Sequence, residues 1–202
     1  MLKKVKAILA GYKSRDAFFR VIASIYTASD WRYKLIERAY QDAKDAFRGI
    51  SRVGGERYFE HLRAVALILI LYLRVTDYRL IVAALLHDIV EDIPSWTIDR
   101  VRREYGEDIA ALVEWMTEPS HIFSDKAECL RVYHKRFAEA PRDFFLVKLA
   151  DRLHNLLTMW SFQRERRQRK LEETKTYYLP YAEKHCILIH ELEAMIAELE
   201  AA

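Results

Sequence analysis

The chain has 202 residues, of which 51% are hydrophobic and 31% are charged, and its formal net charge is +3. This length and composition predict one globular domain, residues 1–202, built on a single substantial core. The mild positive charge suits an anionic small molecule and is too weak to predict nucleic-acid binding. No apolar run is long enough for a membrane span or a signal peptide. Cys129 and Cys186 lack metal-binding spacing, so reduced thiols and a cytoplasmic location are expected.

The predicted secondary structure is helical throughout, because no run alternates polar and apolar residues for long enough to form a convincing strand. In chain order, the predicted helices cover about residues 3–11, 15–28, 31–48, 57–73, 77–92, 97–105, 107–117, 125–138, 142–161 and 170–199. Thr97 is the expected N-cap of one short helix, Gly106 is expected to end it, and the last helix is expected to break near Pro180. The fold class predicted is therefore all-α.

The last predicted helix carries an apolar stripe. Its members repeat at spacings of four, three and four residues: Leu188, Leu192, Met195 and Leu199. Such a stripe usually packs into the core of its own chain and occasionally forms the seam of a dimer. A homo-oligomer is therefore left open.

The most informative stretch sets four ionisable side chains directly after an apolar run. Residues 80–86 are apolar on every side, which is typical of a helix enclosed by others. His87 and Glu91 are four apart, as are Asp88 and Asp92, so all four can project toward one flank of a single helix. Burying several carboxylates without cations would cost several kcal/mol. A bound divalent metal would remove that cost.

Two other segments supply further polar groups of the same kind. His61 follows the glycine pair at 54–55 and begins an apolar stretch. Asp151 and Asn155 lie one helical turn apart within residues 147–156, on a second mostly apolar helix. Together with the first stretch, these segments provide two histidines and two aspartates.

The order of these motifs resembles a known family. His61, then HDxxED over residues 87–92, then LADRLHN over residues 149–155 is similar to the hydrolase domain of the RelA/SpoT family, within the HD-domain metal phosphohydrolases. The resemblance covers about residues 35–182 and ends with a stretch at 173–182 that is similar to the family's ETxxxYxPxA. The chain thus resembles a small alarmone hydrolase.

This resemblance implies a compact multi-helix HD-domain bundle, preceded by an extra N-terminal helical segment over residues 1–30. The synthetase domain that follows the hydrolase domain in long members has no room in this sequence. The implied activity is metal-dependent hydrolysis of the 3′-pyrophosphate of guanosine tetraphosphate or pentaphosphate, giving GDP or GTP and pyrophosphate. The expected partner is accordingly a small phosphorylated nucleotide.

Residue by residue, the resemblance also implies a metal site and a catalytic pair. The metal, usually Mn²⁺ in this family, would be held by His61, His87, Asp88 and Asp151. Two imidazoles and two carboxylates suit Mn²⁺, Fe²⁺ or Zn²⁺ and leave positions open for water and a phosphate oxygen. Glu91 and Asp92 match the family's catalytic acids, which would orient or deprotonate the nucleophile.

Four residues match nucleotide-pocket positions of the family: Arg52, whose guanidinium would stack on the base, Tyr58, Asn155 and Thr158. Arg52, Lys148 or Arg152 would clamp the diphosphate, and the alternative for Lys148 and Arg152 is that both are structural partners of buried carboxylates. His154 is expected to be a hydrogen-bonded core histidine rather than a ligand contact. The remaining histidines lack partners at metal-binding spacing and are expected to be surface or structural: His121, His134, His185 and His190.

The sequence departs from the family near the expected substrate. Val53 and Gly54 stand where Lys and Ser are common, Glu118 where Lys often follows Thr, and Leu157 where Arg is frequent. Two alternatives therefore stay open: hydrolysis of another nucleotide such as NADPH, and a nucleotide-binding regulator without turnover. Retention of both catalytic acids favours the enzyme. The basic run at 164–170 is interpreted as a solvated face, with steering of a phosphorylated ligand or binding of a partner as the alternative.

Overall fold

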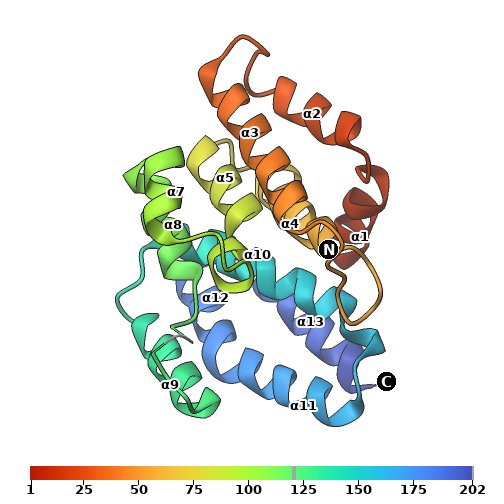
Figure 1. Ribbon diagram of the computed structural model, residues 1–202. Coiled ribbons are helices and arrows are strands. Elements are labelled where there is room, and N and C mark those ends of the chain that lie inside the picture. The colour runs from red at the N-terminus through yellow and green to blue at the C-terminus, as the bar shows by residue number, and fades with distance from the viewer. Residues whose placement is uncertain (120–121, 202) are drawn as a thin grey trace.

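The computed structural model describes residues 1–119 and 122–201, and within these ranges the chain is helical without a strand (Figure 1). The all-α fold class is therefore confirmed, while the expectation for His121 lies outside the described residues. The α-helices are α1 (Leu2–Gly11), α2 (Arg15–Ala23), α3 (Trp31–Ala46), α4 (Tyr58–Leu67), α5 (Tyr78–Leu86), α6 (Ile89–Asp92), α7 (Ile98–Tyr105), α8 (Glu107–Met116), α9 (Lys126–Arg136), α10 (Arg142–Thr158), α11 (Arg164–Glu173), α12 (Leu179–His185) and α13 (Ile189–Glu200). Three short turns extend them: η1 (Ile68–Tyr72), η2 (Met159–Ser161) and η3 (Thr174–Tyr178).

Side-chain caps set where several helices begin. An oxygen of the residue before the helix accepts a hydrogen bond from a backbone N–H of the first turn, which would otherwise lack a partner. The residues that do so are Ser14, Asp30, Asp77, Thr97 and Asp125. The predicted N-cap at Thr97 is therefore confirmed, and Gly106, with φ of +89°, separates α7 from α8 as predicted.

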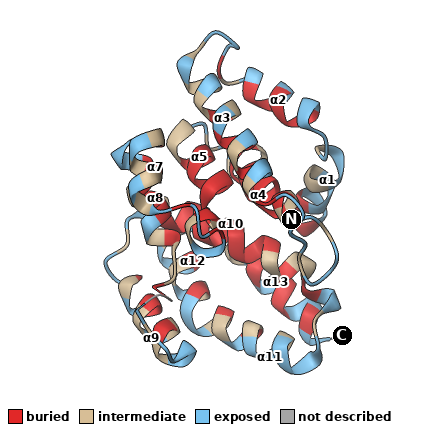
Figure 2. Cartoon of the chain, in the orientation of Figure 1, coloured by how far each residue is buried: buried red, intermediate tan, exposed pale blue. Residues whose placement is uncertain are grey.

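Helix α10 crosses the middle of the molecule, and most of it is buried (Figures 1 and 2). Residues 144–154 are all buried, including the charged or polar Lys148, Asp151, Arg152 and His154. Residues 80–86 of α5 are also buried on every side, as the apolar run predicts. Because charged groups inside a core need partners, the polar residues of α10 mark where a site is built.

The first two helices belong to the same core as the rest. Val5 of α1 and Phe18 and Ile22 of α2 are fully buried, and α1 packs against α4, η1 and α13. The apolar stripe of α13 is buried in this core, with Leu192 and Met195 at 0% exposure, so it packs within its own chain. No described helix is long and apolar enough to cross a membrane.

The single helix expected over residues 77–92 is wrong, because the chain breaks at His87 and Asp88. α5 ends at Leu86, and α6 begins at Ile89 after Asp88, which has φ of −100° and ψ of −1°. The His87 ring closes the end of α5, since its Nδ1 lies 2.9 Å from the backbone oxygen of Ala84. Neighbouring side chains on an unbroken helix diverge by about 100°. The break lets His87 and Asp88 face the same point.

The expected break near Pro180 is also wrong. α11, η3 and α12 follow one another from Arg164 to His185, and the chain turns afterwards, where Cys186 and Leu188 have φ of +56° and +55°. Pro180 lies in the first turn of α12, where a missing backbone N–H costs no hydrogen bond.

Candidate metal centre

Two histidines and two carboxylates converge where α4, the α5–α6 junction and α10 meet. The Nε2 atoms of His61 and His87 lie 3.3 Å apart. Oδ2 of Asp88 lies 3.2 Å from Nε2 of His87 and 3.7 Å from Nε2 of His61. Oδ1 of Asp151 lies 3.2 Å from Nε2 of His61 and 3.7 Å from Nε2 of His87. Nitrogen and oxygen atoms that share one ion at about 2.1 Å lie about 3.0–3.5 Å from one another, so this spacing fits a metal.

Hydrogen bonds at the far side of each ring fix the histidine tautomers. Nδ1 of His61 lies 2.8 Å from Nδ1 of His154, which also lies 3.3 Å from the guanidinium of Arg52. Because arginine can only donate, His154 accepts at Nδ1 and His61 donates. Nδ1 of His87 donates to the backbone oxygen of Ala84. Each ring therefore has Nε2 facing the site, and loss of the proton from Nε2 would direct its lone pair at a metal, as a ligand must.

The two carboxylates are held by hydrogen bonds of their own. Tyr58 donates to Oδ2 of Asp88 at 2.8 Å. Asn155 donates to Oδ1 of Asp151 at 2.6 Å, and Nζ of Lys148 lies 3.5 Å from Oδ2 of the same residue. His61, His87 and Asp88 form a triplet whose ligand atoms all lie within 4.8 Å of one another, and Asp151 contacts both histidines of that triplet. Such supporting contacts fix the direction in which each ligand points.

The electrostatics of the four groups require a positive charge among them. Burial would raise the pKa of Asp88, but His87 beside it lowers that pKa to about 2. Burial would likewise raise the pKa of Asp151, but Lys148 and the two histidines hold it well below its usual value. Burial acts to lower the pKa of His87, and the two aspartates outweigh it and raise that pKa to about 10. A proton held on His87 supplies this positive charge, and a divalent ion bound by the four groups would take the place of that proton.

Glu91 and Asp92 lie on the short α6, one turn beyond the proposed ligands, and both are exposed at the edge of the site. Neither forms an ion pair with the described residues. The backbone N–H of Glu118 donates to Oε2 of Glu91 at 3.1 Å. Although the residue as a whole is exposed, protein atoms around its carboxylate partly desolvate that group, and this desolvation, with the nearby charges of Glu118 and Asp88, raises the pKa of Glu91 to about 7. A carboxylate with that pKa is suited to accept and return a proton near neutral pH.

The Arg52 side chain contacts three residues of α10. Its guanidinium donates to Oδ1 of Asn155 and lies 3.3 Å from both Nδ1 of His154 and Oγ1 of Thr158. Three of the four predicted nucleotide-pocket residues are thus brought together beside the metal centre, while Tyr58 contacts Asp88. Their contact with a nucleotide stays a prediction.

Lys148 and Arg152 lie inside the protein. The side chain of Lys148 is 9% exposed, with its ammonium 5.2 Å from the ring of Tyr133. The Arg152 guanidinium stacks 3.8 Å from the Tyr178 ring and forms an ion pair of 2.7 Å with Glu173. These are the contacts of structural partners of buried carboxylates, the alternative left open by the sequence. A role in clamping a diphosphate stays a prediction for both.

His154 is the supporting residue that sequence reasoning undervalued. It is a buried, hydrogen-bonded histidine, as expected, but its partner is the proposed ligand His61. A signal was present in the motif, because residues three and four positions after Asp151 share its helix face. That spacing selects His154 together with Asn155.

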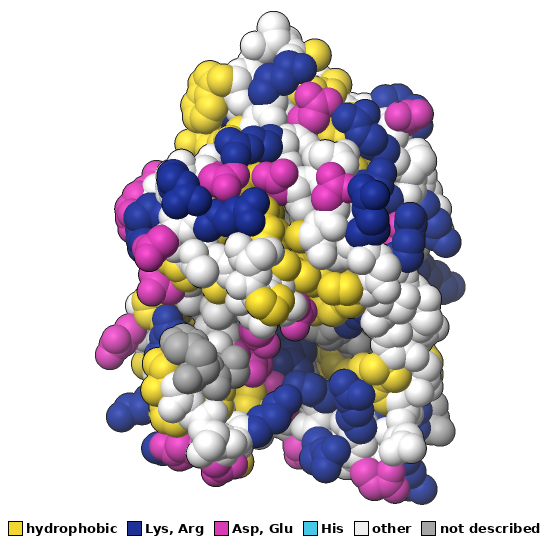
Figure 3. Space-filling model, in the orientation of Figure 1, with side chains coloured by type: hydrophobic (Ala, Val, Ile, Leu, Met, Phe, Trp, Pro, Cys, Tyr) yellow, Lys and Arg dark blue, Asp and Glu magenta, His cyan; other side chains and the backbone are white. Residues whose placement is uncertain are grey.

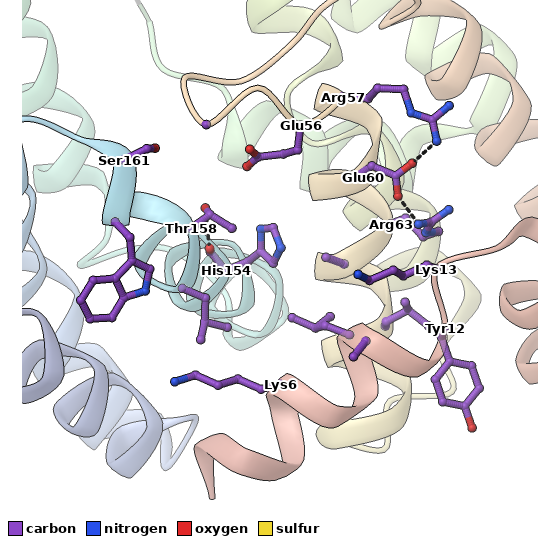
Figure 4. Close-up of a pocket in the computed structure, with 17 residues that line it drawn as sticks. Lys6, Tyr12, Lys13, Glu56, Arg57, Glu60, Arg63, His154, Thr158 and Ser161 are labelled. Carbon is purple, nitrogen blue, oxygen red and sulfur yellow. Dashed lines mark hydrogen bonds and ion pairs between the residues drawn. The ribbon is translucent and has the colours of Figure 1, made fainter.

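Two concave features adjoin these residues. Figure 3 shows a hollow above α11, with acidic side chains and Lys or Arg side chains at its edge. α11 carries the basic run at 164–170 and is mostly exposed (Figure 2), in agreement with a solvated face. A separate cavity of about 810 Å³, bordered by α1, α4 and the end of α10, includes His154 and Thr158 in its wall (Figure 4). No motif in the sequence predicted this cavity.

Comparison with known proteins identifies the family. A family model described as an HD domain matches residues 39–188, which is most of the chain. The chain belongs to the HD-domain family. The predicted relation to the RelA/SpoT hydrolase domain is also confirmed by individual relatives. The chain is 36% identical over 170 residues to the bifunctional (p)ppGpp synthase/hydrolase SpoT of Escherichia coli, covering 82% of this chain and 24% of that protein.

Two further proteins show the same relation. A guanosine-3′,5′-bis(diphosphate) 3′-pyrophosphohydrolase of Aquifex aeolicus is 39% identical over 151 residues, covering 74% of this chain and 21% of that protein. The chain thus spans about a quarter of the length of these curated relatives. A solved structure described as a metazoan ortholog of SpoT that hydrolyzes ppGpp matches with a TM-score of 0.75 at 25% identity, covering 86% of this chain and 97% of the other.

Proposed function

We propose that this HD-domain protein hydrolyses the 3′-pyrophosphate of guanosine tetraphosphate or pentaphosphate and releases pyrophosphate with GDP or GTP. One observation carries the proposal: two imidazole Nε2 atoms and two ionised carboxylates meet at one point, beside an acid whose pKa is about 7. The relatives named as 3′-pyrophosphohydrolases and the metazoan structure support the choice of substrate.

His61, His87, Asp88 and Asp151 are the proposed ligands of one divalent ion, Mn²⁺ in our proposal. When bound, such an ion lowers the pKa of a coordinated water and polarises a phosphoryl oxygen. The residues around the ligands have separate tasks. His154 holds the tautomer of His61. Tyr58 orients Asp88, and Asn155 orients Asp151. Glu91, assisted by Asp92, takes the proton of the attacking water and returns it to the leaving 3′-oxygen.

An ion bound by these four residues would supply positive charge for the phosphoryl oxygens, which leaves Arg52 available to hold the nucleoside. Its planar guanidinium is already fixed by Asn155 and Thr158, so little side-chain entropy is lost on stacking with a base. We further propose a cytoplasmic location, where such nucleotides are made, and leave the oligomeric state to measurement.

The test is a turnover panel with purified, Mn²⁺-loaded protein and guanosine tetraphosphate, GTP, ATP and NADPH. We expect rapid release of pyrophosphate from guanosine tetraphosphate alone. Asp151→Asn, which removes one proposed ligand charge, should lose both the activity and most of the bound metal. Turnover of NADPH without turnover of guanosine tetraphosphate would overturn the substrate assignment, and binding of these nucleotides without any turnover would make the protein a regulator.

A further inference from the structure

The cavity bordered by α1, α4 and the end of α10 has the size and lining of a nucleoside site. Its volume of about 810 Å³ falls within the range of about 300–1,000 Å³ for small-molecule pockets. Leu157 and the half-exposed Trp160 give it an apolar wall that suits a planar ring. Thr158 and His154 connect this wall to the Arg52 cluster and to the metal centre.

Gly54 determines where the side chain of Glu56 lies in this cavity. A Cβ atom built on Gly54 would lie 2.5 Å from Oε2 of Glu56 and 3.3 Å from Oγ of Ser161. Heavy atoms do not approach to 2.5 Å without a bond or a strong hydrogen bond, so any other residue at position 54 would displace the Glu56 carboxylate. The absence of a side chain at Gly54, where the RelA/SpoT family commonly has Ser, therefore gives Glu56 its place in the cavity (Figure 4).

The carboxylate of Glu56 forms no hydrogen bond or ion pair with the residues that the structure describes, while its backbone oxygen accepts from the backbone N–H of Arg52 at 2.8 Å. Glu60, in the same cavity wall, differs because Arg57 and Arg63 both pair with it (Figure 4). An ionised carboxylate can only accept hydrogen bonds, and in the partly buried Glu56 no protein donor occupies its oxygens, which leaves them available to donors of a ligand. The cavity therefore fits a ligand that brings two neighbouring N–H donors to Glu56.

The same cavity attracts anions through cations that α1 supplies. Lys13 lies in its lining without an ion pair to the described residues, and its amine points into the cavity in Figure 4. Lys6 also lines it and pairs with Glu198 at 2.9 Å. Both lysines precede the part of the chain that the HD-domain family model matches. A ligand with a donor edge, a planar ring and phosphates agrees with all of these features.

We propose that Glu56 selects guanine over adenine by accepting hydrogen bonds from the N1–H and the N2 amino group of the base. Guanine presents these two donors side by side, whereas adenine presents the N1 lone pair, which a carboxylate repels. The inference rests on the proposed function, because the guanine belongs to the nucleotide whose 3′-pyrophosphate reaches the metal centre. It makes Glu56 a residue that determines specificity and takes no part in the chemistry.

The experiment measures equilibrium binding of GDP, IDP and ADP to the full, metal-free chain, by calorimetry and by quenching of tryptophan fluorescence, to which Trp160 in the cavity wall contributes. We expect GDP to bind about 10- to 100-fold more tightly than ADP, the range of a good bidentate contact to a base edge, with IDP, which lacks the N2 amino group, in between. Glu56→Ala should bring the three affinities together. Gly54→Ser should do the same, because the added atoms displace the carboxylate.

Glu165→Gln is the matched control, since this exposed carboxylate on α11 does not line the cavity. It should keep the wild-type ratio of GDP to ADP affinity. An unchanged ratio in Glu56→Ala would overturn the inference, and so would equal binding or no binding of the three nucleotides by the wild type. Because no turnover is measured, a guanine preference that depends on Glu56 would stand even if pyrophosphate release from guanosine tetraphosphate failed.

Discussion

Replacing His154 by Leu tests how the site holds its metal. His154 is 7% exposed and contacts the proposed ligand His61 through Nδ1 at 2.8 Å, without contacting either aspartate. Leu fills similar space and removes the acceptor, so His61 is no longer held in the tautomer that directs Nε2 at the ion. Loss of such a supporting partner typically weakens metal binding by about 10- to 100-fold.

The size of the effect follows from mass action. At a Mn²⁺ concentration about 100 times the wild-type Kd, binding stabilises the fold by about 2.7 kcal/mol. A 10-fold weaker site would retain about 1.4 kcal/mol and a 100-fold weaker site about 0.4 kcal/mol. For a chain of this length about 1 kcal/mol corresponds to roughly 2–4 °C, so the Mn²⁺-dependent rise in Tm should shrink by about 3–9 °C in His154→Leu.

Thermal melts with Mn²⁺ and with a chelator provide the measurement. For each variant, the Tm with chelator is subtracted from the Tm with Mn²⁺, which cancels any change in the stability of the metal-free protein. His185→Leu is the matched control, because His185 stacks on Phe145 and lies on α12, away from the metal centre. An equal Mn²⁺-dependent shift in wild type and His154→Leu would refute the supporting role.

The remaining predictions concern turnover. Glu91→Gln combined with Asp92→Asn should keep the metal content and nucleotide binding while lowering kcat by about 100-fold or more, and simultaneous loss of metal would instead make these residues ligands. Because Glu91 accepts a proton only when ionised, kcat/KM should rise with pH up to about 7, the value to which burial and Glu118 raise its pKa. Glu118→Gln removes a repelling charge and should move this rise to lower pH; an unmoved profile would assign it to another group. Arg52→Ala should raise KM more than it lowers kcat, and the opposite split would place Arg52 in the chemistry.

Periodicity and capping predicted the helices well, because they depend on neighbours in sequence. The N-cap at Thr97, the stop at Gly106 and the enclosed α5 all follow from local patterns. The break at His87 did not, because it is stabilised by a contact of the ring with Ala84 and by the convergence of groups from three segments. Periodicity alone cannot report that a tertiary contact outweighs helix continuity.

At the site, too, features that depend on local motifs were predicted from the sequence, and features that depend on tertiary contacts were not. The sequence predicted which side chains meet at the metal centre, since the three motifs place them on apolar helices that pack together. It did not predict the cavity bordered by α1, because its walls come from segments without a shared motif and its shape depends on how Gly54 and Glu56 fold back. The interior contacts of Lys148 and Arg152 likewise depend on partners far along the chain, Tyr133 and Glu173.

Product analysis tests the central claim most directly. Guanosine tetraphosphate is incubated with the Mn²⁺-loaded protein, and the products are followed by ³¹P NMR, with the chelator-treated protein as the reference. The account predicts equal amounts of GDP and pyrophosphate, formed only when metal is present. Release of orthophosphate, loss of phosphate from the 5′ position, or the same products in the presence of chelator would contradict it.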